Sequence, residues 1–164
     1  MAGALVEVVR YHAWANRCLI DACAALTAEQ LELTASGTYG PIWTTLGHLV
    51  GSELYYLFAL TGRWLTEPLR EGERYELAEL RERAERTAEG LEEAAARVRP
   101  TRMLRLRRAG EERRIPAVAM VIQVLHHGAE HRAQVATILG AHGIRPPNLS
   151  GWAYGERLKL VPPQ

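Results

Sequence analysis

The stretch PAVAMVIQVLHHGAEHRAQVATILGAHG, residues 116–143, decides the fold that the sequence predicts. Its apolar residues recur at steps of three and four, which places them on one face of an α-helix. Pro116 suits the first turn of a helix, and Gly140 and Gly143 suit its end. We therefore predict a long amphipathic helix from about residue 116 to residues 140–143. Its core stripe is expected to contain Val121, Val124, Gly128, His131, Val135 and Ile138.

A second helix is predicted over about residues 41–61, PIWTTLGHLVGSELYYLFALT, a segment that is apolar on nearly every side. We expect it to be the most buried helix. Gly47 and Gly51 lie one turn apart, so they predict the close approach of a neighbouring helix. His48 and Glu53 are its strongly polar side chains, and each needs a partner if it is buried.

Two further amphipathic helices are predicted over about residues 3–25 and 77–98, the latter ending before Pro100. The segment 27–40 is rich in Thr, Ser and Gly and is predicted to be a loop. Short alternation over 102–115, around Ala109 and Gly110, predicts a small β-hairpin. The tail from Pro146 leaves room for one or two more helical turns. The stripe of the first helix contains Leu5, Val9, His12, Asn16, Leu19, Cys23 and Leu26.

These elements predict an all-α fold, a four-helix bundle with longer connections and a small β-hairpin between the third and fourth helices. The chain of 164 residues is long enough for one compact core, so we expect residues 1–164 to form a single helical bundle domain. Hydrophobic residues make up 48% and charged residues 24%, which is typical of globular proteins.

Charge and hydropathy exclude several classes of partner. The formal net charge is +1, so no strong global field attracts nucleic acid or an anionic membrane. Segment 97–114 holds eight arginines, but it lacks interleaved aromatic residues, and we favour a solvated hairpin over a nucleic-acid contact. The N-terminus does not resemble a secretory signal and no segment has about 20 consecutive apolar residues, so we expect a cytoplasmic protein. Cys18 and Cys23 lie on different helix faces and are not expected to form a disulfide.

The strongest chemical signal is HHGAEHRAQ, residues 126–134. His127 and His131 are four residues apart, so their imidazoles project from the same helix face and can bind one metal ion. Such a pair also occurs through coincidence or core packing. His48 is the best third ligand because an imidazole in an apolar helix needs a partner, although a bond to a backbone carbonyl would also satisfy it.

Three segments in order resemble the DinB/YfiT-like family of metal-binding proteins. YHAWANRCL (11–19) is similar to its Tyr-x-x-Trp-Ala-Asn motif, TTLGHLVGSE (44–53) to its central histidine segment, and HHGAEHRAQ (126–134) to its His-x-x-x-His-Arg-x-Gln motif. The resemblance covers most of the chain. It implies that His48, His127 and His131 bind one divalent metal ion, for which Zn²⁺, Ni²⁺, Fe²⁺ and Mn²⁺ are candidates, and it implies a homodimer.

The resemblance also implies an activity. Some members of the family transfer low-molecular-weight thiols such as bacillithiol or mycothiol to electrophiles, and a related branch isomerises maleylpyruvate. Three neutral histidines leave open coordination positions on a divalent ion, as catalytic sites do. We therefore expect a metal-dependent thiol transferase acting on a small-molecule substrate.

Two alternatives remain open. A metal-dependent hydrolase would need a general base, and His127 to His131 also fits the pattern H-x-x-E-H, in which Glu130 activates water. That pattern needs a distant downstream carboxylate, whereas only Glu156 follows His131. His12 and Asn16 either line the site, as further catalytic candidates, or make ordinary buried hydrogen bonds. The second alternative is a non-enzymatic metal-binding or interaction module, in which the metal ion only joins two helices.

Overall fold

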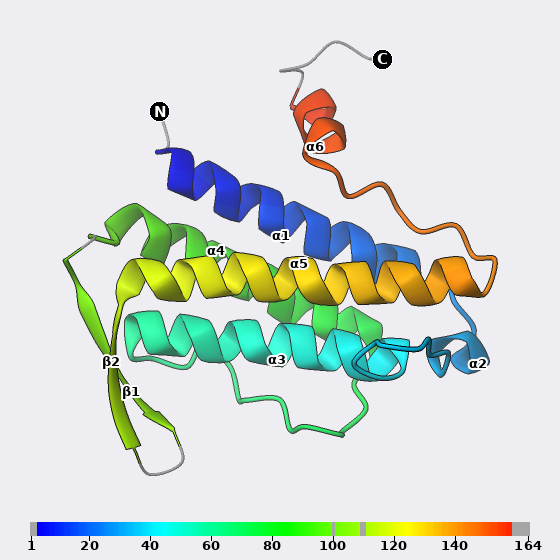
Figure 1. Ribbon diagram of the computed structural model, residues 1–164, viewed down its shortest axis with the longest axis horizontal. Coiled ribbons are helices and arrows are strands. Elements are labelled where there is room, and N and C mark those ends of the chain that lie inside the picture. Colours follow the sequence, from blue (N-terminus) through cyan, green and yellow to red (C-terminus); the bar gives the residue numbers. More distant parts are fainter. Residues whose placement is uncertain (1–2, 100, 109–110, 159–164) are drawn as a thin grey trace.

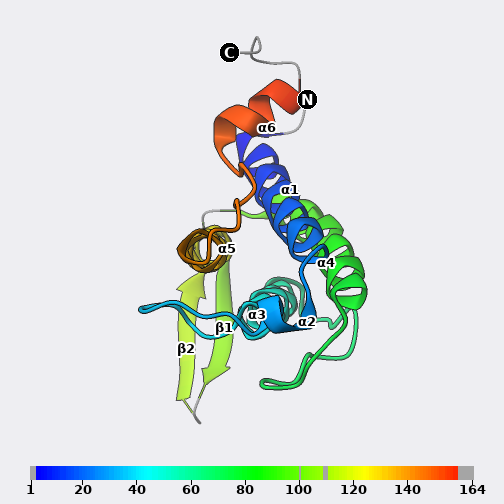
Figure 2. The same ribbon diagram turned by 90° about the vertical axis from the view of Figure 1, so that its right-hand side faces the viewer.

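The computed structural model describes residues 3–99, 101–108 and 111–158. Its body consists of the long helices α1 (Ala4–Cys23), α3 (Ile42–Thr61), α4 (Leu77–Arg97) and α5 (Ala117–Ala141). Helices α1 and α3 each pack against both α4 and α5, so the four helices form a closed ring around the core (Figure 2). The predicted helical bundle is confirmed.

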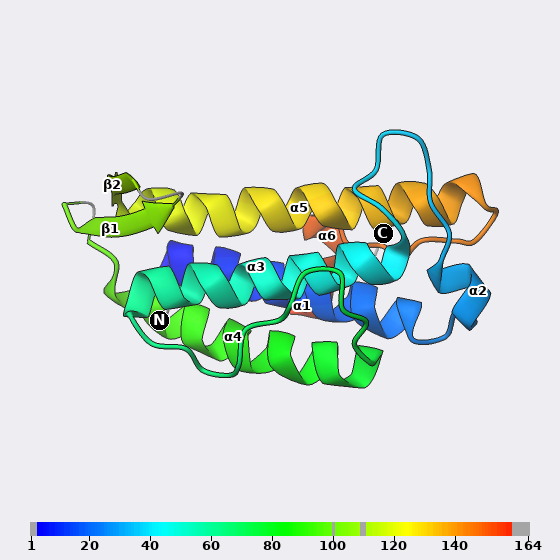
Figure 3. The same ribbon diagram turned by 90° about the horizontal axis from the view of Figure 1, so that it is seen from below.

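The connections between the helices determine which loops cover which faces. Helices α1 and α5 run in one direction, and α3 and α4 run in the opposite direction (Figure 1). Because α3 and α4 are parallel, residues 62–76 return along the bundle from the end of α3 to the start of α4 (Figure 3). This return places the loop beside α3.

The predicted hairpin is present between α4 and α5. Strands β1 (Met103–Arg108) and β2 (Glu111–Pro116) pair antiparallel, with Leu104 opposite Ile115. The turn predicted at Ala109 and Gly110 lies outside the described residues. In the tail, the predicted helical turns are helix α6 (Gly151–Arg157), which contacts α1.

The core consists of two apolar clusters. One contains Val9, Leu57 and Val124, and the other contains Leu19, Leu46 and Ile138. Between them, each of α1, α3 and α5 carries buried polar side chains. The polar residues of this layer are His12, Asn16, Glu53, His127, His131 and Arg132.

The structure corrects two expectations about the chain between residues 27 and 61. The predicted loop 27–40 contains the short helix α2 (Ala28–Leu31), which begins with a capping box between Thr27 and Gln30. Helix α3 is not buried on every side, and no helix packs at its glycines: Gly47 faces open space, and Gly51 faces Leu69 in the return loop. The prediction of a close helix approach is therefore wrong, because this face of α3 borders a cleft.

The structure also bears on the cysteines and on membrane-spanning helices. Cys18 and Cys23 are free thiols, as predicted. None of the helices within residues 3–99, 101–108 and 111–158 combines the length and the apolar character that a membrane span requires.

Candidate metal centre

Three histidine side chains converge between α3 and α5. The Nε2 atom of His127 lies 3.2 Å from Nε2 of His48 and 3.1 Å from Nε2 of His131. One ligand nitrogen from each residue lies within 4.8 Å of the other two. Nitrogens that bind one zinc ion at about 2.0–2.1 Å in a tetrahedral site are about 3.4 Å apart, so this spacing fits one ion. His127 and His131 are buried, whereas His48 is only half-buried, in contrast to the expectation for its helix.

The other ring nitrogens of His48 and His131 have partners that fix the tautomer. His131 Nδ1 lies 2.9 Å from Gln134 Oε1, an oxygen that only accepts, so Nδ1 carries the proton. His48 Nδ1 lies 3.1 Å from the Tyr39 hydroxyl, which donates its own proton to Glu71 Oε1 at 2.9 Å. His48 Nδ1 therefore donates to Tyr39. In both residues the Nε2 lone pair is left free for a metal.

The surroundings also favour the neutral form of two of the imidazoles, those of His48 and His127. Burial, together with the charges of His131 and His48, lowers the pKa of His127 to about 4. Burial and His131 lower the pKa of His48, an effect that Glu71 partly opposes. Neutral imidazole is the form that binds metals. Three lone pairs at this spacing repel one another, and a bound cation removes the repulsion, so the donor set fits a divalent ion.

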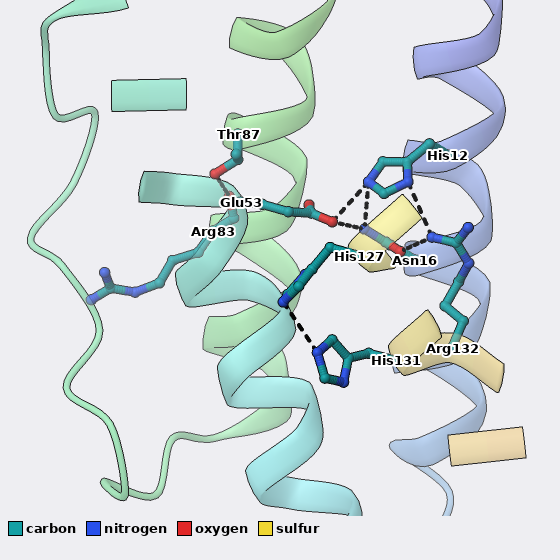
Figure 4. A network of polar contacts seen from close by, with 8 residues as sticks. All are labelled: His12, Asn16, Glu53, Arg83, Thr87, His127, His131 and Arg132. Atoms are coloured by element: carbon teal, nitrogen blue, oxygen red, sulfur yellow. Dashed lines mark hydrogen bonds and ion pairs between the residues drawn. The ribbon is translucent and has the colours of Figure 1, made fainter. Parts of the chain in front are cut away.

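A buried polar layer lies beside His127 and His131, between α1, α3 and α5 (Figure 4). Arg132 Nη1 lies 2.6 Å from Asn16 Oδ1 and 3.1 Å from His12 Nδ1. Because the guanidinium only donates, His12 Nδ1 must accept, and its Nε2–H donates to Glu53 Oε1 at 2.7 Å. Asn16 Nδ2 donates to the same oxygen at 2.6 Å.

This layer balances one negative and one positive charge in the core. Burial by itself raises the pKa of the Glu53 carboxyl, but the hydrogen bonds that it accepts from His12 and Asn16 and the charge of Arg132 outweigh this effect. The pKa of Glu53 is therefore lowered, and the group is a carboxylate. Gly128 makes room for the layer, since a Cβ atom at this position would overlap the His12 ring.

An open cleft borders two of the three histidines on the side of α3. Its volume is about 1080 Å³, and both His48 and His127 form part of its wall. The return loop 62–76 and the hairpin contribute to its rim. Other residues of its wall are Tyr39, Trp43, Ser52, Tyr55, Tyr56, Arg70, Glu71, Arg113 and Gln123. A ligand in this cleft would reach the Nε2 atoms of His48 and His127 directly.

The sequence model of the DinB family matches residues 1–157. The chain belongs to the DinB family. Among solved structures, a DinB-like protein from Bacillus cereus ATCC 10987 superposes with a TM-score of 0.67 and 14% sequence identity, over 88% of this chain and 94% of that one. This likeness concerns the fold. No curated protein matches the chain.

The remaining catalytic candidates of this DinB-family chain, and two further histidines, lie apart from the cleft. Glu130 is exposed on α5 and is not part of the cleft wall. His12 and Asn16 are bonded within the buried layer, which corresponds to the second of the two expectations for them. His126 is exposed, and His142 is exposed with its Nε2 on the Thr34 carbonyl.

Sequence reasoning did not predict the partners of Glu53 and Arg132 or the contacts of Tyr39 and Glu71. Arg132 is buried, and its guanidinium is linked across the core to Glu53 through His12 and Asn16. The sequence feature that pointed to a buried partner for Glu53 was its charge within an otherwise apolar helix. Tyr39 and Glu71 lie in loops, and no pattern of spacing marked them.

Proposed function

We propose that this DinB-family protein is a metal-dependent enzyme that transfers a low-molecular-weight thiol to a small electrophile, with His48, His127 and His131 binding one divalent ion. The observation that carries the proposal is the convergence of three Nε2 atoms beside an open cleft, with His48 and His127 in the cleft wall. A site with three protein ligands and solvent access is typical of catalytic rather than structural metal centres.

The metal would supply acidity, since a thiol bound to a divalent ion loses its proton near neutral pH. In the reaction, the thiol would give up its proton to solvent, and its sulfur would form a bond to the electrophilic carbon. The leaving group would depart with the electron pair of the broken bond, or an epoxide ring would open and its oxygen would take up a proton from solvent. The protein would orient the two reactants within the cleft.

The cleft residues support two bound reactants. Small-molecule sites in proteins usually occupy about 300–1,000 Å³, so a cleft of about 1080 Å³ has room for a thiol and an electrophile together. Trp43, Tyr55 and Tyr56 offer apolar surface to an electrophile. Arg70 and Arg113 offer positive charge at the rim.

A metal-dependent hydrolase is the second candidate, because a carboxylate is present in the cleft wall. Glu71 accepts a hydrogen bond from Tyr39 beside His48, so a general base near the metal is available. Glu130, the base that the H-x-x-E-H pattern suggests, is outside the cleft. We favour thiol transfer because Glu71 is already bonded to Tyr39.

The test uses metal-loaded protein, a chloro-dinitro-aromatic or an epoxide, and a panel of small thiols. Conjugate formation should depend on the thiol and disappear in His131→Ala. His126→Ala changes an exposed histidine on the same helix and should leave turnover unchanged. Metal-dependent cleavage of esters or amides without thiol turnover would replace the transferase by the hydrolase. A large loss of thermal stability on metal removal, with no turnover of any substrate, would favour the non-enzymatic module.

The homodimer remains part of the proposal. Exposed apolar side chains on three helices support it: Val8 is 44%, Ile122 59% and Trp152 67% exposed. Such side chains are often covered by a second subunit. Sedimentation equilibrium should give twice the mass of the chain, and a monomer at micromolar concentration would contradict this assignment.

A further inference from the structure

Two loops that are distant in sequence meet at His48. Tyr39 lies between α2 and α3, and Glu71 lies in the return loop between α3 and α4. The Tyr39 hydroxyl is 3.1 Å from His48 Nδ1 and 2.9 Å from Glu71 Oε1. The Tyr39 ring also stacks on the His48 imidazole, with 4.3 Å between ring centroids and 24° between planes.

The direction of these hydrogen bonds determines the state of His48. A carboxylate has no proton to donate, so the proton of the Tyr39 hydroxyl points to Glu71. The Tyr39 oxygen then accepts from His48 Nδ1–H. With its proton on Nδ1, His48 presents the Nε2 lone pair toward His127 Nε2, 3.2 Å away.

His48 needs this support more than the other two histidines. His127 and His131 are 8% and 4% exposed, so packing restricts their rings, whereas His48 is half-buried at the wall of the cleft. A half-buried imidazole can rotate or exchange tautomers unless polar partners hold it. The stacked ring and the hydroxyl of Tyr39 provide two separate restraints.

We propose that Tyr39 and Glu71 are positioning residues that hold His48 in the tautomer and orientation that bind a metal ion. This inference rests on the metal centre of the proposed function, and it assigns a role to two residues outside the three ligands. When a ligand histidine is hydrogen-bonded through a partner to a carboxylate, its ring is held in orientation and its free nitrogen becomes a stronger metal ligand. The negative charge of Glu71 would also partly neutralise the positive charge of a bound ion.

The two loops could instead be tied together for stability alone, and the chain offers a matched control for that alternative. Tyr75 lies in the same return loop, accepts from Arg70 N at 2.8 Å and donates to Glu73 Oε2 at 3.0 Å. Tyr75→Phe therefore removes a hydroxyl that bonds to a glutamate of this loop without touching His48. Tyr39→Phe keeps the stacked ring and removes only the hydroxyl.

The experiment measures Zn²⁺ affinity by competition with a chromophoric chelator, and the visible absorption spectrum of the Co²⁺-loaded protein. Loss of a hydrogen-bond partner of a ligand histidine typically weakens metal affinity about 10-fold to 100-fold. We expect a loss in this range for Tyr39→Phe and Glu71→Ala, with a changed Co²⁺ spectrum, and wild-type values for Tyr75→Phe. Glu71→Gln changes an exposed side chain, should fold normally, and should give a smaller loss because its amide oxygen still accepts.

Wild-type affinity in Tyr39→Phe and Glu71→Ala would overturn the inference. An equal loss in Tyr75→Phe would also overturn it, because loop tethering would then explain the effect. The metal centre is tested separately by His131→Ala. If that variant keeps wild-type affinity, the proposed function fails, whereas a loss in His131→Ala with no loss in Tyr39→Phe removes only the roles of Tyr39 and Glu71.

Discussion

The Nε2 atoms of His48 and His127 lie 3.2 Å apart although 79 positions separate the two residues in the chain. The pairing depends on the contact between α3 and α5, which brings the histidine of one helix opposite the histidine pair of the other. The polar layer behind them fills the space toward α1. The candidate metal ligands and the buried polar layer therefore lie next to each other in the bundle.

Gln134 is expected to hold His131 as Tyr39 holds His48. Its Oε1 accepts from His131 Nδ1 at 2.9 Å and from the Tyr39 backbone N–H at 3.3 Å. Gln134→Ala should weaken Zn²⁺ affinity about tenfold, because His131 loses the acceptor that fixes its tautomer. Chelator competition measures the change. Gln123→Ala removes an amide from the same helix and should have no effect, and equal affinities in the two variants would contradict the role of Gln134.

Gly128 should tolerate no side chain. A Cβ atom at this position would overlap the His12 ring and approach Arg132 Nη1 at 2.9 Å, and both groups are fixed by buried hydrogen bonds. Gly128→Ala should therefore lower the free energy of unfolding by about 1–3 kcal/mol, measured by urea denaturation.

The control for this substitution is Gly140→Ala, on the same helix. Nothing lies within 4 Å of a Cβ atom at Gly140, so alanine there should be neutral or slightly stabilising. Two variants of equal stability would show that the buried layer can move aside, contrary to the packing described.

The sequence predicts the helices well and the polar contacts only in part. Periodicity located α1, α4 and α5 because each buries one apolar stripe, whereas α3 was located by its continuous apolar character. The spacing of His127 and His131 brought them together within a single helix. The burial of Arg132 could not be predicted, since arginine is usually exposed and its partners lie on another helix. Tyr39 and Glu71 meet only because the return loop follows the bundle.

The stability of the metal-free protein should depend on Glu53 in a specific pH range. The pKa of Glu53 is lowered in the folded state, whereas in the unfolded chain it is about 4.3. The stabilisation is therefore complete above about pH 4.3 and is lost as the pH falls through the folded-state pKa. At neutral pH, Glu53→Gln leaves the Arg132 charge without compensation and should cost about 3 kcal/mol.

Urea denaturation of the wild type and of Glu53→Gln at several pH values tests this dependence. The difference between their free energies of unfolding should be largest at neutral pH and shrink below pH 4. Glu93→Gln serves as a control, since Glu93 forms only an exposed pair with Arg97 and should change stability by less than about 1 kcal/mol. A difference for Glu53→Gln that is constant with pH would show that its charge does not stabilise the fold.

The central claim, that His48, His127 and His131 bind one metal ion, is tested most directly by the metal content of the purified protein, measured by elemental analysis after reconstitution and removal of loose metal. We predict about one divalent ion per chain, because three neutral nitrogens converge on one point. His48→Ala, His127→Ala and His131→Ala should each lose most of it, while the exposed-histidine variants His126→Ala and His142→Ala should retain it. Full occupancy in all three triad variants, or none in the wild type, would contradict the assignment.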